Sequence, residues 1–275
     1  MWVDGARVSA DGPAVSAVDH GVTVGDGAFE TLKVQDGRPF AMRRHLARLD
    51  RTMAGLGLPP ADHDRVREGV EAVLDGAPVE FGRLRWTVTG GRGPLGSDRL
   101  GADLTYIVTA VAHPRPPAVG DVVTVPWVRN ERSATAGLKT TSYADNVVAL
   151  ARAQERGALE AVLANTRGEL CEGTGSNVFV VRDGVVRTPP LTSGCLAGVT
   201  RELLLEWCAA DGVEVREETL PLEALAGGDE VFLTSSIKDV LPVGAVDGVA
   251  LSAPGPVTAR VQQVWAQHAA RTDDP

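Results

Sequence analysis

The alternation of hydrophobic and polar residues predicts a chain in which short strands and amphipathic helices are interspersed. The turn dipeptides Asp4-Gly5 and Asp36-Gly37 stand between apolar runs, a pattern typical of hairpins. Residues 45–56 and 64–74 carry apolar side chains at helical spacing, and a glycine follows each stretch. Around these two helices we predict strands at 29–34, 38–42, 84–89 and 104–110.

The proline-rich stretch 113–117 interrupts this pattern and is typical of a linker. The mixture of elements on both sides of it predicts a mixed α/β protein of the α+β class, with two domains. We place a small N-terminal domain at 1–113, a linker at 114–120 and a larger domain at 121–275. In the larger domain we predict strands at 122–125, 161–164 and 230–233, a hairpin of 178–181 with 185–187, and helices at 143–156, 200–210 and 257–269.

Composition and charge exclude several classes of function. The chain has 275 residues and a formal net charge of −9, which argues against a nucleic-acid partner. Its arginines are interspersed with acids, its first residues lack the apolar run of a signal peptide, and no apolar stretch suits a membrane span. An odd set of cysteines (Cys171, Cys195 and Cys208) predicts a reducing compartment, so we expect a cytoplasmic protein without membrane contact. The scattered histidines and cysteines indicate no metal site.

Lysine is scarce, which narrows the search for a reactive amine. It occurs only at Lys33, Lys139 and Lys238. Lys139 lies between a loop and a predicted helix and has small neighbours, which leave room for a bulky group. A buried or electropositive site lowers the pKa of an amine and makes it a Schiff-base nucleophile. The alternative is a surface lysine at the start of a helix.

Four further segments suit a ligand with a phosphate and a flat ring. Glu172 precedes small residues and an apolar strand, so its carboxylate could lie beneath a flat ring or simply border a glycine-rich hairpin. The stretch 193–203 runs into a helix whose N-terminal N–H groups could bind an anion, or whose Thr200 could be an ordinary cap. The hydroxyls of 234–236 and the guanidinium of Arg48 could bind phosphate. The alternatives are that the hydroxyls simply end a strand and that Arg48 is a solvated helix residue.

Taken together, these segments resemble the fold-type IV pyridoxal-phosphate enzymes, the class IV aminotransferase family. The resemblance runs from 24–31 (Val-Gly-Asp-Gly-Ala-Phe-Glu-Thr) to Ser236. It rests on the order of an early Arg-Leu, a central lysine, Glu-Gly-x-Gly-x-Asn, Leu-x-Gly-Val-Thr-Arg and a hydroxyl cluster. It implies that pyridoxal 5'-phosphate binds between the two domains and that the protein is a homodimer acting on a small-molecule substrate.

The resemblance also implies roles for individual residues. Lys139 matches the Schiff-base lysine that then moves protons, and Glu172 matches the carboxylate that keeps the pyridine nitrogen protonated. The positions that match phosphate ligands are Arg48, the backbone N–H groups of Val199 and Thr200, and the hydroxyl of Ser236; Leu196 matches the residue packed on the ring. Tyr143 stands one place before the tyrosine of branched-chain transaminases and is a candidate substrate contact.

Three subfamilies remain open within this family, because the cofactor supports both transamination and elimination and substrate-side residues decide between them. Residues 25–31 and 90–93 match aminodeoxychorismate lyases, so our main prediction is conversion of 4-amino-4-deoxychorismate to 4-aminobenzoate and pyruvate, with Thr31 and Arg92 as substrate contacts. The alternative is a transaminase for branched-chain or D-amino acids. Leu95 and Ser97 stand where D-amino acid transaminases have Arg-x-His, which disfavours the D-specific version. A non-catalytic protein that binds the cofactor is a third possibility.

Overall fold

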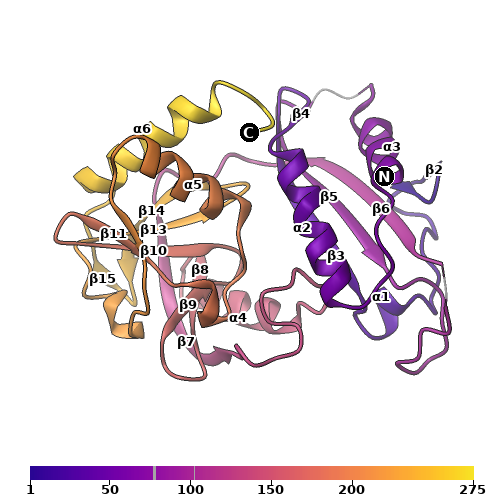
Figure 1. Cartoon of the computed structure of the whole chain (residues 1–275), viewed down its shortest axis with the longest axis horizontal. Helices are drawn as coiled ribbons and strands as arrows, with labels where there is room; N and C mark the ends of the chain where they lie inside the picture. Colours follow the sequence, from indigo (N-terminus) through magenta and orange to yellow (C-terminus); the bar gives the residue numbers. More distant parts are fainter. Residues whose placement is uncertain (77–78, 102) are drawn as a thin grey trace. The chain divides into compact units, whose positions relative to one another are not determined.

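The computed structural model describes residues 1–76, 79–101 and 103–275, and these divide into two compact units. Unit 1 comprises Met1–Arg115, Leu138–Tyr143 and Asp274; unit 2 comprises Pro116–Gly137, Ala144–Asp273 and Pro275. Each unit contains one sheet with helices packed against it (Figure 1). The architecture is therefore the mixed helix-and-sheet fold that the sequence predicts.

The described part of unit 1 holds a six-stranded antiparallel sheet in the order β2-β1-β6-β5-β3-β4. The strands are β1 (Trp2–Val3), β2 (Ala6–Arg7), β3 (Gly27–Gln35), β4 (Arg38–Pro39), β5 (Phe81–Thr89) and β6 (Thr105–Ala112). The helices are α1 (His20–Thr23), α2 (Met42–Gly55) and α3 (His63–Leu74).

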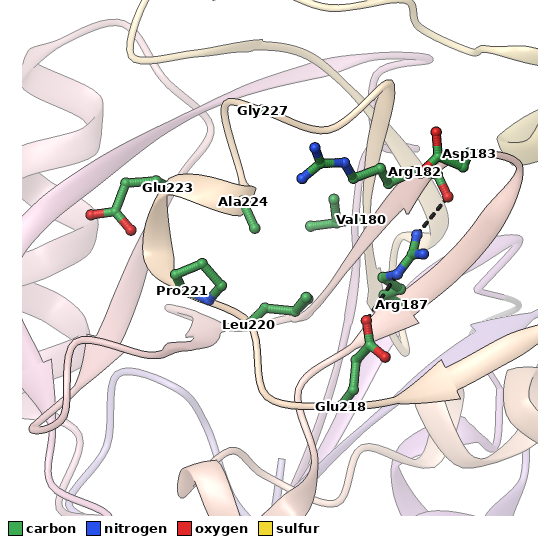
Figure 2. A pocket seen from close by; sticks show the side chains of 10 residues that line it. All are labelled: Val180, Arg182, Asp183, Arg187, Glu218, Leu220, Pro221, Glu223, Ala224 and Gly227. Carbon is green, nitrogen blue, oxygen red and sulfur yellow. Dashed lines mark hydrogen bonds and ion pairs between the residues drawn. The ribbon is translucent and has the colours of Figure 1, made fainter.

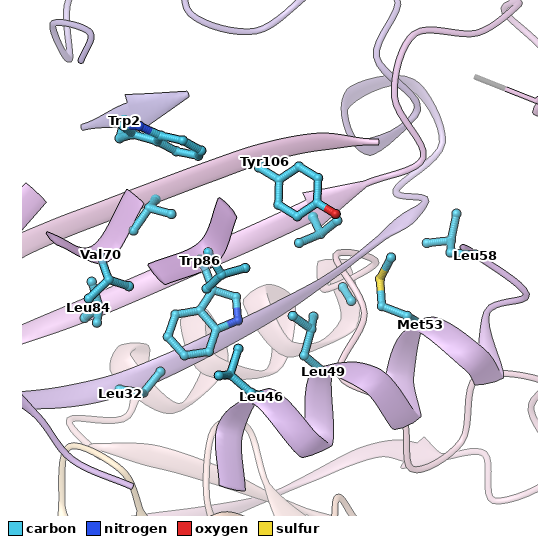
Figure 3. Packing of buried hydrophobic residues seen from close by; sticks show 14 of the residues in the cluster. Trp2, Leu32, Leu46, Leu49, Met53, Leu58, Val70, Leu84, Trp86 and Tyr106 are labelled. Carbon is cyan, nitrogen blue, oxygen red and sulfur yellow. The ribbon is translucent and has the colours of Figure 1, made fainter. Parts of the chain in front are cut away.

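One face of this sheet is the core of unit 1. Leu46 and Leu49 of α2 pack against Trp86 of β5, and Val70 of α3 closes the same cluster (Figure 3). Successive strand residues point to opposite faces. The residues that alternate with the core positions therefore lie on the other face, among them Phe29, Thr31 and Arg85.

Unit 2 holds a mixed sheet in the order β12-β11-β10-β13-β14-β7-β8-β9, with β15 paired to β14. Its strands are β7 (Gly120–Arg129), β8 (Glu160–Asn165), β9 (Leu170–Gly173), β10 (Asn177–Arg182), β11 (Val185–Thr188), β12 (Val215–Glu217), β13 (Glu230–Ser235), β14 (Asp239–Val246) and β15 (Val249–Ala250). Its helices are α4 (Ala144–Glu155), α5 (Val199–Ala210) and α6 (Pro256–Ala269), with 3-10 turns at Leu191–Ser193 and Leu222–Ala224.

The sheet of unit 2 curls, because β9 at one end of the strand order also contacts β10. Alternate residues of β10 serve two sides: Val178 and Val180 join an apolar cluster with Val162 and Leu233, while Phe179 stacks on Phe232 at a centroid distance of 4.8 Å. Helix α4 packs on β7 and β8, and α5 packs on β13. Glu172 and the start of α5 therefore belong to the same unit.

The structure confirms the predicted helices and most predicted strands, with ends that differ by a few residues. The predicted strand at 38–42 is wrong beyond Pro39: Ala41 adopts a left-handed conformation (φ 59°) and α2 begins at Met42. Strands β9 and β14 were not predicted. β9 contains Glu172 and Gly173, and β14 contains a proline and a glycine, all of which weaken a local strand signal.

Candidate active site

Lys139 lies beside β3 in unit 1. The Phe29 amide donates to the Lys139 carbonyl (3.1 Å), and the Thr141 amide donates to the Gly27 carbonyl (2.8 Å). Lys139 Nζ lies 4.2 Å from the centroid of the Phe29 ring and 5.5 Å from that of Tyr143. The two rings meet edge to face at 5.1 Å. The half-buried amine is thus held against an aromatic pair rather than extended into solvent.

Arg85 shares the Phe29 ring with Lys139. Its guanidinium carbon lies 3.7 Å from the ring centroid, and its strand position is in register with Thr31. Burial lowers the pKa of Arg85, and no carboxylate among the described residues pairs with it. Two cations around one ring form an electropositive face suited to an anionic group. Arg85 was not predicted from the sequence as a site residue. What points to it is its position directly opposite Thr31, which the pairing of β3 with β5 creates.

Arg48 is buried in unit 1 within a cluster that the sequence did not reveal. Its Nε donates to Glu30 Oε1 (2.8 Å) and its Nη2 donates to Glu30 Oε2 (2.6 Å). His45 Nδ1 lies 2.6 Å from the same Oε2. Glu30 comes from β3, whereas His45 and Arg48 lie three residues apart on the buried face of α2.

The electrostatics of this cluster keep Glu30 charged and His45 neutral. Burial alone would raise the pKa of Glu30, but the charge of Arg48 and hydrogen bonds from Arg48 and His45 lower it to about 2. Burial lowers the pKa of His45 and outweighs the opposing effect of Glu30. Arg48 is therefore a cation whose Nε–Nη2 edge is fixed by a bidentate carboxylate.

Glu172 is the centre of the candidate cofactor residues in unit 2. It lies on β9, opposite Leu163 of β8, and is buried. Its Oε1 pairs with Arg129 Nε at 3.0 Å, and its Oε2 accepts from the Leu196 amide at 2.9 Å. The structure therefore brings together two residues, Glu172 and Leu196, that the sequence assigned to the same ligand.

The N-terminus of α5 provides backbone donors without a side-chain cap. Gly198 is its N-cap residue, and Val199 and Thr200 begin the helix. The first N–H groups of a helix have no acceptor within it, so an anion can bind there. A Cβ atom at Gly198 would lie 2.0 Å from Asn177 Oδ1, so the close approach of these segments requires glycine. Ser236 directly follows β13, which packs against α5.

The glycine-rich loop 90–97 has a structural explanation as well as a family resemblance. A Cβ atom at Gly93 would lie 2.3 Å from Nε2 of the buried His20, and one at Gly90 would lie 2.5 Å from Asp26 Oδ2. Arg92, between these glycines, is exposed. The loop therefore packs on His20 and Asp26 through its glycines, which accounts for part of the Gly-Gly-Arg-Gly match.

Other features of the described residues carry no chemistry of this kind. Burial raises the pKa of the Cys171 and Cys195 thiols, so neither is a ready nucleophile. The described residues contain no group of three potential metal ligands, and none of their helices is long and apolar enough to cross a membrane. A hollow of about 480 Å³ in unit 2 lies around Leu220 and the Arg187–Glu218 ion pair, and it contains none of the candidate residues (Figure 2).

Residues 27–246 match the family model described as amino-transferase class IV. The chain belongs to the class IV aminotransferase family. This family uses pyridoxal phosphate, and each unit by itself contains groups that suit it: unit 1 has an amine held on aromatic rings, and unit 2 has a buried carboxylate and an uncapped helix N-terminus.

Relatives of this class IV protein are mostly transaminases. It is 32% identical to the D-alanine aminotransferase of Bacillus licheniformis, over 90% of this chain and 89% of that one. The Escherichia coli branched-chain amino acid aminotransferase structure has a TM-score of 0.88 and 28% identity, covering 95% and 91% of the chains. A Legionella pneumophila structure provisionally named a 4-amino-4-deoxychorismate lyase has a TM-score of 0.86 and covers 94% and 96%, but its 24% identity shows the fold alone. The comparisons therefore favour the transaminase alternative over the lyase.

Proposed function

We propose that this protein is a pyridoxal-phosphate-dependent transaminase that transfers the amino group of a branched-chain amino acid to a 2-keto acid. The observation that carries the proposal is the arrangement of Lys139 and Arg85 around the Phe29 ring. A transaminase needs an amine at the reacting carbon and a cation for the substrate carboxylate beside it. A guanidinium with no acidic partner among the described residues suits a carboxylate, which it can bind through two parallel hydrogen bonds.

The remaining candidate residues divide into cofactor and substrate groups. We assign Arg48, Val199, Thr200 and Ser236 to the cofactor phosphate, Glu172 to the pyridine nitrogen and Leu196 to the ring face. Tyr143 lies against Phe29, and Thr31 lies in register with Arg85, and on this basis we assign both to the substrate side with Arg85. Arg92 remains a proposed substrate contact.

The bound cofactor supplies an electron sink that makes the Cα–H bond of the substrate acidic. Lys139 Nζ would take the proton from the Cα atom of the donor amino acid and, in the second half of the reaction, would give a proton to the corresponding carbon of the acceptor 2-keto acid. Glu172, which pairs with Arg129 and accepts a hydrogen bond from the Leu196 amide, would lie at the pyridine nitrogen and would hold a proton on that nitrogen. The Phe29 and Tyr143 rings limit the positions open to the Lys139 amine and reduce its contact with water.

Leu95 and Ser97 favour a branched-chain over a D-amino acid substrate. They stand where the D-specific enzymes have Arg-x-His, and Leu95 is exposed in the loop. A residue without charge at this place removes the carboxylate ligand expected for D-specific binding. Arg85 of β5 is then the remaining carboxylate ligand that we propose.

We further propose that two copies form a homodimer in the cytoplasm. In unit 2, Trp127 and Val128 of β7 and Val147 and Val148 of α4 are exposed, and β7 contacts α4. Exposed large apolar side chains on neighbouring elements suit an interface with a second copy. The cysteines are free thiols, which persist in a reducing compartment. Light scattering coupled to size-exclusion chromatography tests the dimer, and a monomer at micromolar concentration would contradict it.

Product analysis tests the reaction. The protein loaded with pyridoxal phosphate is incubated with L-leucine, L-valine or D-alanine and with 2-oxoglutarate or pyruvate as acceptor. We expect more than one equivalent of keto acid per bound cofactor from the L-substrates only when an acceptor is present, because the cofactor itself can accept one amino group. Release of pyruvate and 4-aminobenzoate from aminodeoxychorismate without an acceptor would establish the lyase instead. A colourless protein that takes up no cofactor would overturn both enzyme assignments.

A further inference from the structure

Lys238, which the proposed reaction does not use, forms an ion pair with a buried carboxylate in unit 2. Its Nζ contacts Glu160 Oε2 and also donates to Ser176 Oγ at 3.0 Å. Glu160 is 1% exposed and lies at the start of β8. Its Oε2 also accepts from Ser176 Oγ at 2.9 Å, and its Oε1 accepts from the Gly175 amide. Both carboxylate oxygens are therefore satisfied by the same short loop and one lysine.

The loop 173–177 is shaped around Glu160. A Cβ atom at Gly173 would lie 2.7 Å from Glu160 Oε1, so the backbone approaches the carboxylate more closely than a side chain permits. The Gly173 amide donates to the Ser176 carbonyl at 2.8 Å, which closes the loop on itself. Removal of the Glu160 charge or of its partner would therefore release the loop rather than a single side chain.

This loop is connected to the residues proposed to contact the cofactor ring. Glu172 immediately precedes it in the sequence. At its other end, Asn177 Nδ2 donates to the Leu196 carbonyl at 2.8 Å, and the Leu196 amide donates to Glu172 Oε2 at 2.9 Å. Asn177 also packs against Gly198 at the start of α5. The positions of Glu172, Leu196 and the helix N-terminus therefore depend on one loop.

Lys238 is connected in the same way to the proposed phosphate hydroxyl. Its backbone amide donates to Ser235 Oγ at 3.3 Å, within the turn that contains Ser236. The Glu160–Lys238 pair thus joins the turn that carries Ser236 to the loop that begins at Glu172. The short phosphate arm limits how far the phosphate of pyridoxal phosphate can lie from the ring, so the affinity would depend on the separation of these two segments.

We propose that Glu160 and Lys238 are positioning residues for the cofactor: their ion pair sets the spacing between the Glu172–Leu196 ring site and the Ser236 turn. This inference rests on the proposed function. A buried ion pair is weak support for stability, because desolvation offsets much of the attraction, so a role in positioning accounts better for its placement. Neither residue touches the cofactor in this proposal; both act through the loop and the turn.

The test measures cofactor affinity of the apoenzyme by quenching of tryptophan fluorescence, beside thermal unfolding of the same apoenzyme. Lys238→Met keeps the length of the side chain and removes its charge. We expect the dissociation constant for pyridoxal phosphate to rise about 10- to 100-fold and Lys238→Arg to restore part of the affinity. Lys33→Met is the matched control: Lys33 is a buried lysine of unit 1 that lies over Phe40, and its loss should leave the affinity unchanged.

The outcomes separate this inference from the proposed function. If the wild-type apoenzyme binds no pyridoxal phosphate, the proposed function fails. If the wild type binds it and Lys238→Met binds it equally well, the positioning role is wrong, even if the variant melts at a lower temperature. Should Lys238→Met fail to fold, the double variant Glu160→Gln/Lys238→Met removes both charges of the pair without leaving either of them unpaired. Wild-type affinity in that variant would overturn the proposal, whereas a loss of affinity at an unchanged melting temperature would support it.

Discussion

Glu30 and Arg48 form a buried bidentate ion pair, with Nε–Oε1 and Nη2–Oε2 distances of 2.8 and 2.6 Å. The pair fixes the orientation of a guanidinium that the family resemblance assigns to the cofactor phosphate. Glu30 is fully buried. The ion pair needs an ionised carboxylate, so its contribution to stability is lost when Glu30 is protonated.

The pH dependence of stability tests this pair. Burial alone would raise the pKa of Glu30, but the charge of Arg48 and the hydrogen bonds from Arg48 and His45 outweigh it, so folding lowers this pKa from 4.5 to about 2. The contribution of this pKa shift to the free energy of unfolding is fully present above about pH 4.5 and is lost as the pH falls toward 2. We expect the free energy of unfolding to fall by about 3 kcal/mol over this pH range. Urea unfolding between pH 3 and pH 6 would detect part of that loss. Glu30→Gln should show a flatter pH profile, and Glu68→Gln on the exposed face of α3 should keep the wild-type profile. Equal profiles for the wild type and Glu30→Gln would contradict the ion-pair assignment.

Substitution of Lys139 tests the Schiff-base assignment. Lys139→Ala should remove covalent attachment of the cofactor after borohydride reduction and lower kcat by at least about 1000-fold, because the amine both attaches and moves the proton. Mass spectrometry of the reduced protein identifies the modified residue. Lys33→Ala and Lys238→Ala should still be labelled at Lys139. Labelling at either of those lysines in the wild type would show that Lys139 is the wrong amine.

Arg85 should determine the affinity for the substrate carboxylate. Arg85→Met removes a charge-assisted contact of about 2 to 3 kcal/mol, so KM should rise about 30- to 160-fold with a smaller effect on kcat. Arg83→Met is the control on the same face of β5, because Arg83 is exposed and contacts His113 instead. Wild-type KM in Arg85→Met would remove Arg85 from the substrate site.

Arg92 is the competing candidate from the sequence. If Arg92 touches the substrate, Arg92→Ala should also raise KM. Because its side chain is exposed and the glycines beside it have a packing role, we expect its effect to be smaller than that of Arg85→Met. Kinetics unchanged from the wild type would exclude Arg92 as a substrate contact.

Gly198→Ala should disturb the start of α5 without straining its backbone. The φ of Gly198 is −67°, which alanine tolerates, but the new Cβ would lie 2.0 Å from Asn177 Oδ1. Displacement of Asn177 should cost about 1 to 3 kcal/mol of unfolding free energy and weaken cofactor binding. Gly227→Ala is the matched control, since its Cβ would meet its nearest neighbour at 3.4 Å. An unchanged melting temperature together with unchanged cofactor affinity in Gly198→Ala would show that this close approach has no consequence.

Local sequence patterns were sufficient for the elements whose signal lies within a few residues. The apolar spacing of α2 and α3, the turns at Asp4-Gly5 and Asp36-Gly37 and the hairpin of β10 with β11 were all predicted. In each case the periodicity or the turn chemistry is contained in the element itself. The strand predicted at 38–42 shows the limit, because the left-handed Ala41 directs the chain into α2.

By itself the sequence indicated the family and one candidate each for the reactive amine and the carboxylate, because Lys139 and Glu172 stand within short motifs and lysine is rare in this chain. Only the tertiary structure placed Arg85 and Lys139 on one aromatic ring, Arg48 on Glu30, and Lys238 on Glu160. Glu160 and Lys238 are 78 positions apart in the sequence, and the local pattern around either residue carries no sign of the other. The physical reason is that charge pairing and burial depend on distance in space, which strand register and helix packing set and which local periodicity does not contain.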